Sequence, residues 1–174
     1  MRPIRCVTSW RGPLRSAIVR PILLAAALLA TAKTASADAT LFIGNTATPS
    51  SRQVKGFAVG AGLLIVGVEF EYANTSEDSE EAAPRLRTGM GNLLLQTPFA
   101  IAGVQPYFTT GGGAYRETLG TQQETSFGFN TGGGVKVSLL GPVRARLDYR
   151  VFKLRGDPLR DVVHRIYAGV NVKF

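Results

Sequence analysis

The sequence predicts an all-β fold, an eight-stranded antiparallel up-and-down β-barrel that crosses a membrane. Three observations lead to this prediction. The final segment, Val162–Phe174, alternates between apolar and polar side chains over a length that spans a bilayer as a tilted strand. Short segments rich in aromatic and β-branched residues recur between turn-forming clusters, and 20 scattered glycines disfavour helices. The first 37 residues have the form of an export signal.

Residues 1–37 are interpreted as a cleaved signal peptide, and residues 38–174 as the barrel domain. A basic segment precedes the apolar run Ile22–Ala30, and Ala35–Ala37 matches a small-x-small cleavage site, so the mature chain would begin at Asp38. The apolar run is too short for a transmembrane helix, which needs about 20 residues. An Arg-rich organelle transit peptide is the alternative interpretation.

The formal net charge of +8 belongs mostly to this leader. Six of the 20 basic residues lie in the first 37 positions, which contain no acidic residue, so 14 basic residues face 12 acidic ones in the rest of the chain. We therefore expect no nucleic-acid partner. Cys6 is the only cysteine and lies in the leader, so the domain has no thiol for a disulfide or a metal site. We expect no cofactor and no metal.

The first three predicted strands lie at about 39–45, 56–63 and 66–74. Aromatic and β-branched residues mark the first strand, and the polar segment 46–55 ends it. The junction between the second and third strands has no polar turn signal, and we place a tight turn near Leu64. In the third strand, valines and aromatic residues alternate with two glutamates, which is the period of a strand with one apolar face.

The remaining strands follow from the same alternation. It is cleanest in the sixth strand, where phenylalanines alternate with glycines, and in the seventh, where apolar residues alternate with Arg and Asp. Polar or Pro- and Gly-containing segments separate these strands. The predicted order is an acidic loop at 75–84, a strand at 85–96, a turn at 97–103, a strand at 104–116, a polar loop at 117–124, a strand at 125–139, a tight turn at 140–142, a strand at 143–154, a loop at 155–161 and the strand at 162–174.

Eight strands are an even number and the smallest size usual for membrane barrels. The connections after the first, third, fifth and seventh predicted strands are longer and polar, and the other three are short. That alternation is expected when one end of a barrel faces the periplasm and the other faces outside. A closed barrel leaves no open edge in lipid, and we expect it to be a monomer.

Periodicity alone does not say which face of each strand points inward. A charge on the lipid face costs about 2–4 kcal/mol at mid-depth, and the interior of an eight-stranded barrel is just wide enough for side chains to fill. We therefore expect an ion-paired, largely plugged interior, with surplus basic groups near the rims matched by water or lipid phosphate. A soluble lipocalin-like carrier with the opposite polarity is the alternative. The charged residues predicted to point inward are Glu69, Glu71, Arg85, Arg87, Lys136, Arg144, Arg146, Asp148, Arg150, Arg165 and Lys173.

Four sequence motifs carry a family resemblance: Pro106–Tyr115, Phe127–Lys136, Val143–Arg150 and Tyr167–Phe174. With them the chain resembles the outer-membrane β-barrel domain family, which includes OmpA/OmpX-like and small porin-family proteins of Gram-negative bacteria. The resemblance covers Val104–Phe174 and is loose before it. It implies a cell outer-membrane location, with the membrane lipid and lipopolysaccharide as surroundings. The chain end is similar to the signal read by the barrel-assembly machinery, and its residues here are Tyr167, Val170, Val172 and Phe174.

The resemblance does not imply one activity, because this fold serves many roles. We expect a structural or interaction role at the envelope, and no enzymatic activity. A small passive pore for ions or very small solutes is the alternative. A lipid-modifying enzyme is the third hypothesis. It would require His164, the only histidine, to meet a hydroxyl and a carboxylate at one rim. The acidic residues at 77–81 lack the spacing of a calcium loop, and we expect a solvated loop there.

Overall fold

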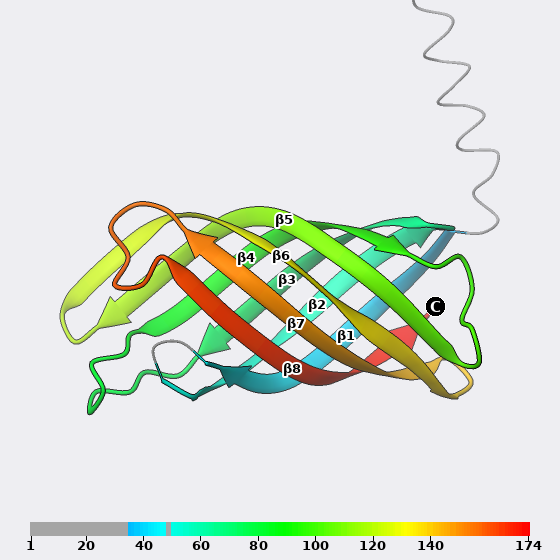
Figure 1. Cartoon of the computed structure of the whole chain (residues 1–174), viewed down its shortest axis with the longest axis horizontal. Helices are drawn as coiled ribbons and strands as arrows, with labels where there is room; N and C mark the ends of the chain where they lie inside the picture. The colour runs from blue at the N-terminus through cyan, green and yellow to red at the C-terminus, as the bar shows by residue number, and fades with distance from the viewer. Residues whose placement is uncertain (1–34, 48–49) are drawn as a thin grey trace, which may run out of the picture. The chain divides into compact units, whose positions relative to one another are not determined.

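The computed structural model describes residues 35–47 and 50–174, which form a closed antiparallel β-barrel (Figure 1). Each strand pairs with the next, and β8 pairs with β1 to close the barrel. Within these residues no helix is long and apolar enough to cross a bilayer. The strands are β1 (Ala35–Thr46), β2 (Arg52–Leu63), β3 (Val66–Thr75), β4 (Arg85–Gln96), β5 (Val104–Leu119), β6 (Gln122–Leu140), β7 (Val143–Leu154) and β8 (Val162–Lys173).

The predicted fold class, an eight-stranded antiparallel barrel, is confirmed. The bounds of β4 and β7 are those predicted, and the tight turn near Leu64 joins β2 to β3. Leu64 has a φ of 54°, in the left-handed region that usually favours glycine. A leucine at this position explains why the turn has no ordinary sequence signal. The predicted signal peptide lies outside the described residues up to position 34, and Ala35–Ala37 form the start of β1.

The polar loop predicted at 117–124 was wrong. β5 and β6 continue through it and are joined by a two-residue turn at Gly120 and Thr121, where Gly120 has a φ of 58°. The backbone pairing of β5 and β6 continues beyond the apolar region of the barrel. Polar residues are therefore opposite each other there, as Glu117 is opposite Glu124. The predicted alternation of loop lengths therefore fails at this hairpin, which extends beyond its neighbours at the left of Figure 1.

Inside and outside have opposite polarity. Large apolar side chains lie on the outer surface, where Phe127 is 68 % exposed and Leu147 is 53 % exposed, whereas Arg146 and Arg150 are buried inside. A soluble carrier would have the reverse arrangement, so that alternative is contradicted. Hydrocarbon requires both features: an apolar exterior, because charges there are costly, and a closed barrel, because pairing between strands leaves no backbone edge unsatisfied in lipid.

We use two terms for the ends of the barrel. The termini end carries the start of β1, the end of β8 and the connections β2–β3, β4–β5 and β6–β7, and the loop end carries the other four connections. In Figure 1 the loop end is at the left. In outer-membrane barrels, longer loops face the outside and short turns face the periplasm.

Glycines on the inner face make room for bulky neighbours, and this can be tested at Gly134. A β-carbon there would lie 2.1 Å from the carbonyl oxygen of Leu147 and 2.6 Å from the Tyr107 hydroxyl oxygen. We expect Gly134→Ala to lower the free energy of unfolding by about 1–3 kcal/mol, because a packed site has to shift. Gly89→Ala is the control, since nothing lies within 4 Å of a β-carbon at that position. Urea titration in detergent, followed by the heat-dependent shift of the barrel on a gel, measures both; equal stability of the two variants would contradict the prediction.

Candidate functional site: the charged interior

A cluster of six charged side chains fills the middle of the barrel interior. β3 supplies two glutamates, β7 supplies three residues at alternate positions, and β8 supplies one arginine. Alternate residues of a strand share a face, so all six point inward. Each is at most 3 % exposed. We call this set the central cluster: Glu69, Glu71, Arg146, Asp148, Arg150 and Arg165.

Arg150 contacts all three carboxylates of the central cluster. Its guanidinium nitrogens lie 2.9 Å from Glu69, 3.0 Å from Glu71 and 3.0 Å from Asp148. Arg146 bonds Glu69 and lies 3.0 Å from Asp148, and Arg165 lies 3.2 Å from Glu71. Three arginines therefore face three carboxylates, and the cluster is neutral as a unit.

Two tyrosines complete the cluster. Tyr107 donates a hydrogen bond to Asp148 and accepts one from Arg146 Nε at 2.7 Å. The Tyr167 hydroxyl lies 3.0 Å from Glu71 and 2.9 Å from Asp148. Sequence reasoning did not assign Tyr107 to the charge network, and it assigned Tyr167 to the assembly signal rather than to this network. The aromatic ring made both residues look like packing or interface residues, although a buried tyrosine hydroxyl needs a polar partner.

A second layer lies toward the termini end. Lys136 Nζ is 2.6 Å from Asp38, and Arg144 is 3.2 Å from the same carboxylate oxygen. Arg144 also donates to Asn171 at 2.8 Å and to Gln105 at 3.0 Å. Sequence reasoning missed Asp38 because the first strand was predicted to begin one residue later. Extending the alternation backwards from Thr40, whose side chain is buried inside, would have placed Asp38 on the inner face.

The prediction that Arg85 and Arg87 point inward was wrong. Arg85 and Arg87 are exposed on the outer surface of β4, and their neighbours Leu86 and Met90 are buried inside. The prediction assumed that charges always take the inner face, which holds only at the depth of the hydrocarbon. Lys173 is the last residue of β8 and is exposed at the termini end rather than buried in the interior.

These corrections change the charge balance of the interior. The predicted set held eight basic and three acidic residues. Without the three exposed residues, and with Asp38, Arg52 and Glu117 added, the described interior set holds six basic residues and five acidic ones. Almost every buried charge in this set thus has an opposite charge beside it, as the low polarity of an interior requires.

An apolar layer separates the central cluster from the loop end. Six buried side chains pack together there, and the Arg165 guanidinium lies 4.3 Å from the centre of the Phe152 ring, within cation–π distance. Such a layer keeps water away from the ion pairs below it, and ion pairs are stronger where water is excluded. The layer consists of Leu86, Met90, Tyr115, Phe152, Leu154 and Val163.

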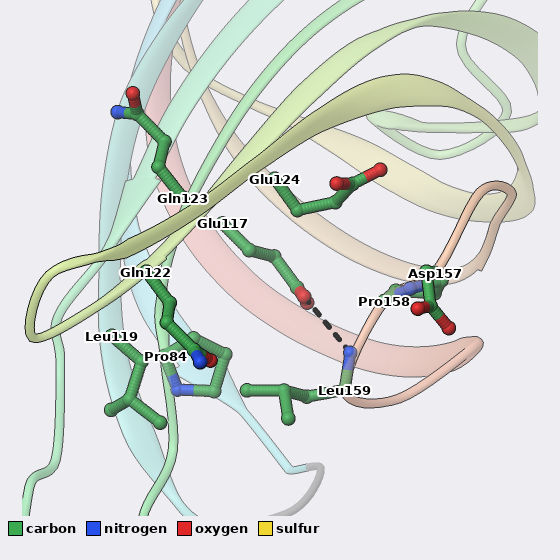
Figure 2. A pocket seen from close by; sticks show the side chains of 9 residues that line it. All are labelled: Pro84, Glu117, Leu119, Gln122, Gln123, Glu124, Asp157, Pro158 and Leu159. Atoms are coloured by element: carbon green, nitrogen blue, oxygen red, sulfur yellow. Dashed lines mark hydrogen bonds between the residues drawn. The ribbon is translucent and has the colours of Figure 1, made fainter.

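The mouth at the loop end contains a cavity of 690 Å³ (Figure 2). Glu117 points across it and accepts a hydrogen bond from the backbone nitrogen of Leu159 at 3.0 Å, which ties the β7–β8 loop to β5. The carboxylates of Glu124 and Asp157 also line the cavity. In residues 35–47 and 50–174, no group of three or more His, Cys, Asp or Glu side chains is placed to hold a metal ion.

His164 lies on the outer surface rather than in the interior. Its Nδ1 atom is 2.8 Å from the hydroxyl oxygen of Tyr149, and the two rings are 6.2 Å apart. Nearby in sequence, Asp161 lies in an exposed ion pair with Lys153 at 3.8 Å. His164 therefore has the Tyr149 phenol as its partner, and such a pair of polar aromatic side chains is suited to a membrane interface.

Solved structures provide the comparison. The chain is similar to Neisserial surface protein A, with 18% identity, a TM-score of 0.62, and coverage of 80% of this chain and 96% of that one. It is also similar to the N-terminal β-barrel domain of Pseudomonas aeruginosa OprF, with 15% identity, a TM-score of 0.60, and coverage of 80% and 97%. For the outer membrane enzyme PagL the identity is 12%, the TM-score is 0.51, and the coverage is 78% and 98%.

The chain has the fold of the small outer-membrane β-barrels. The apolar exterior and the charged interior agree with this fold and suit a barrel that crosses a lipid bilayer. No protein-family model matches the sequence, and no curated protein matches it. At these identities the neighbours show a shared fold, and their individual roles do not transfer to this barrel.

The central cluster yields a prediction for stability. Glu71→Gln and Arg165→Met each leave a buried charge with fewer partners, and we expect each to lower the free energy of unfolding by about 3–5 kcal/mol. The double variant removes both charges, and we expect it to cost about 0.5–3 kcal/mol less than the sum of the single variants. The control Arg87→Met makes the same change on the outer surface, where about 0.5 kcal/mol or less is expected. Additive single effects in urea titrations would contradict the pairing.

Proposed function

We propose that this chain has a structural or interaction role in the outer membrane, that its interior side chains block passage through the barrel, and that it is not an enzyme. The observation that carries the proposal is the placement of the ion pairs. β3 and β7 are four strands apart in a ring of eight, so they lie on opposite walls. Arg146 and Arg150 on β7 reach Glu69 and Glu71 on β3, and these pairs therefore span the interior from wall to wall.

The energetics support a closed interior. An ion that passed through the barrel would have to separate these pairs, and breaking one buried pair costs about 3–5 kcal/mol. The guanidiniums also stack near the tyrosine rings, with Arg146 at 4.9 Å from the Tyr107 ring centre and Arg150 at 5.8 Å from that of Tyr167. These contacts hold the arginines at several points, so moving one side chain disturbs the others.

A non-enzymatic role is supported by the surroundings of His164. Lipid hydrolysis with a histidine base needs a nucleophilic hydroxyl on one side of the ring and an acid that orients it on the other. The partner of His164 is the Tyr149 phenol, and the nearby Asp161 pairs with Lys153 instead. The similarity to the enzyme PagL is one of fold, and it brings no catalytic residues to this barrel.

A second candidate is a narrow passage for water or protons. Three inward-facing polar atoms on β4, β5 and β6 have no hydrogen-bond partner among the described residues: Asn92 Nδ2, Thr109 Oγ1 and Asn130 Oδ1. Buried polar atoms of this kind are commonly satisfied by ordered water. Water beside the central cluster would support proton passage while the ion pairs exclude larger ions.

The membrane location predicts the behaviour of the chain in a Gram-negative host. We expect the protein in the outer-membrane fraction, with a band that migrates differently before and after heating because the folded barrel resists detergent. Fractionation of the envelope followed by gels of heated and unheated samples tests this. A soluble periplasmic protein with no heat-dependent shift would contradict the proposal.

The blocked interior predicts the electrical behaviour. In planar bilayers we expect no stable ion conductance from the wild type. Glu69→Ala combined with Arg150→Ala removes one acid and one base from the central cluster, and we expect it to produce ion conductance. Lys153→Ala with Asp161→Ala is the matched control, because it removes an exposed ion pair at 3.8 Å. Steady wild-type conductance at the level of the cluster variant would instead establish a pore.

A further inference from the structure

Three arginines stand together on the outer surface of β4 and β5 at the loop end. In the strand register Arg87 lies directly opposite Arg116, and Arg85 lies two residues further along the same face of β4. All three side chains are exposed. We call them the outer arginine cluster.

The outer arginine cluster has no acidic partner of its own. Among the described residues, no carboxylate lies in ion-pair contact with Arg85, Arg87 or Arg116, and Arg116 donates a hydrogen bond from Nε to Thr125 at 3.1 Å. Like charges directly opposite each other on neighbouring strands are destabilising. Each arginine of the central cluster contacts a carboxylate, whereas on this outer surface an anion from outside the chain would relieve the repulsion.

An apolar groove lies on the same two strands, on the membrane side of the cluster. Gly91 and Gly112 form its floor, and a β-carbon at Gly91 would meet only the Gly112 carbonyl oxygen, at 3.9 Å. Gly91 is four residues from Arg87 on the same face, about 13 Å along the strand. The larger side chains along the groove are Val68, Leu93, Thr110 and Phe129.

The far wall of the groove carries a further cation. The Arg155 guanidinium lies 5.4 Å from the centre of the Phe129 ring, and Arg155 is exposed. Basic groups therefore stand both above the groove and beside one wall. Arginine binds phosphate oxygens through two parallel hydrogen bonds, and several arginines spread over two strands suit a ligand with more than one phosphate.

We propose that the outer arginine cluster and the groove below it form one binding site for a phosphorylated, multiply acylated glycolipid of the outer leaflet, of the lipid A type. The phosphates contact Arg85, Arg87 and Arg116, and an acyl chain lies in the groove over Gly91 and Gly112. The inference rests on the proposed membrane location, because only then does the loop end reach the outer leaflet.

The mouth cavity is a poor competitor for the same ligand. Its charged lining consists of the carboxylates Glu117, Glu124 and Asp157, which repel phosphate. Charge complementarity therefore favours the outer wall of β4 and β5 over the mouth. A lipid bound there would remain in its own leaflet, with its acyl chains parallel to the apolar surface of the barrel.

The test is a titration of the folded barrel in detergent with lipid A, read by native mass spectrometry. We expect Arg87→Gln with Arg116→Gln to lower the affinity about tenfold, because two charge-assisted contacts are lost. Lys153→Gln with Arg160→Gln is the matched control, since it removes two exposed basic residues at the same end, and less than about a twofold change is expected. Dephosphorylated lipid A should bind the wild type about as weakly as lipid A binds the double variant.

A second variant tests the groove separately from the charges. A β-carbon at Gly91 would meet no atom closer than 3.9 Å, so we expect Gly91→Leu to place its side chain in the groove and to weaken lipid A binding while the barrel stays folded. Three results would each overturn the inference. The cluster variant and its charge control could lose affinity equally, or the cluster variant could bind as the wild type does. Inorganic phosphate or phosphatidylglycerol could also displace bound lipid A as effectively as lipid A itself does. A heat-dependent gel shift confirms folding of every variant. A chain that never folds into membranes contradicts the proposed function, whereas a folded barrel that does not bind contradicts this inference alone.

Discussion

The ion pairs between β3 and β7 are the interaction on which the interior of this barrel depends. They join walls that are distant in sequence and opposite in space, and Arg150 alone meets Glu69, Glu71 and Asp148. A buried charge is stable only beside an opposite charge and with its hydrogen bonds made. The positions of the neighbouring tyrosines, glycines and apolar side chains follow from that requirement.

The glycines of β6 show how the backbone accommodates these pairs. A β-carbon at Gly132 would lie 2.8 Å from Arg150 Cα, and one at Gly134 would lie 2.6 Å from the Tyr107 hydroxyl oxygen. Small residues on one strand thus leave the space that bulky residues on its neighbours fill. The apolar layer near the loop end, which includes Phe152, then covers the pairs, so the interior consists of polar and apolar layers rather than a uniform polar channel.

The sequence predicts those features that depend on alternation within one strand. The bounds and inner face of β7 follow from its clean period of two, and the turn at Leu64 follows from spacing alone. The partners of each charge depend on the register between strands, which is not local, so the pairing of Asp38 with Lys136 could not be read from the sequence. The faces of Arg85 and Arg87 were mispredicted because β4 leaves the hydrocarbon at its loop end, where an outward charge is no longer costly.

The two sets of arginines differ in where their counter-charge comes from. Inside the barrel, only the chain itself can neutralise a guanidinium, and each arginine of the central cluster contacts a carboxylate. At the outer rim the surroundings can supply the anion, and there Arg87 and Arg116 face each other with no carboxylate of residues 35–47 and 50–174 in ion-pair contact. Two neighbouring arginines repel each other only weakly where water surrounds them, and a phosphate bound between them would turn this repulsion into attraction. The outer arginine cluster therefore lies where an anionic lipid can neutralise it, about 13 Å along β4 from the groove at Gly91.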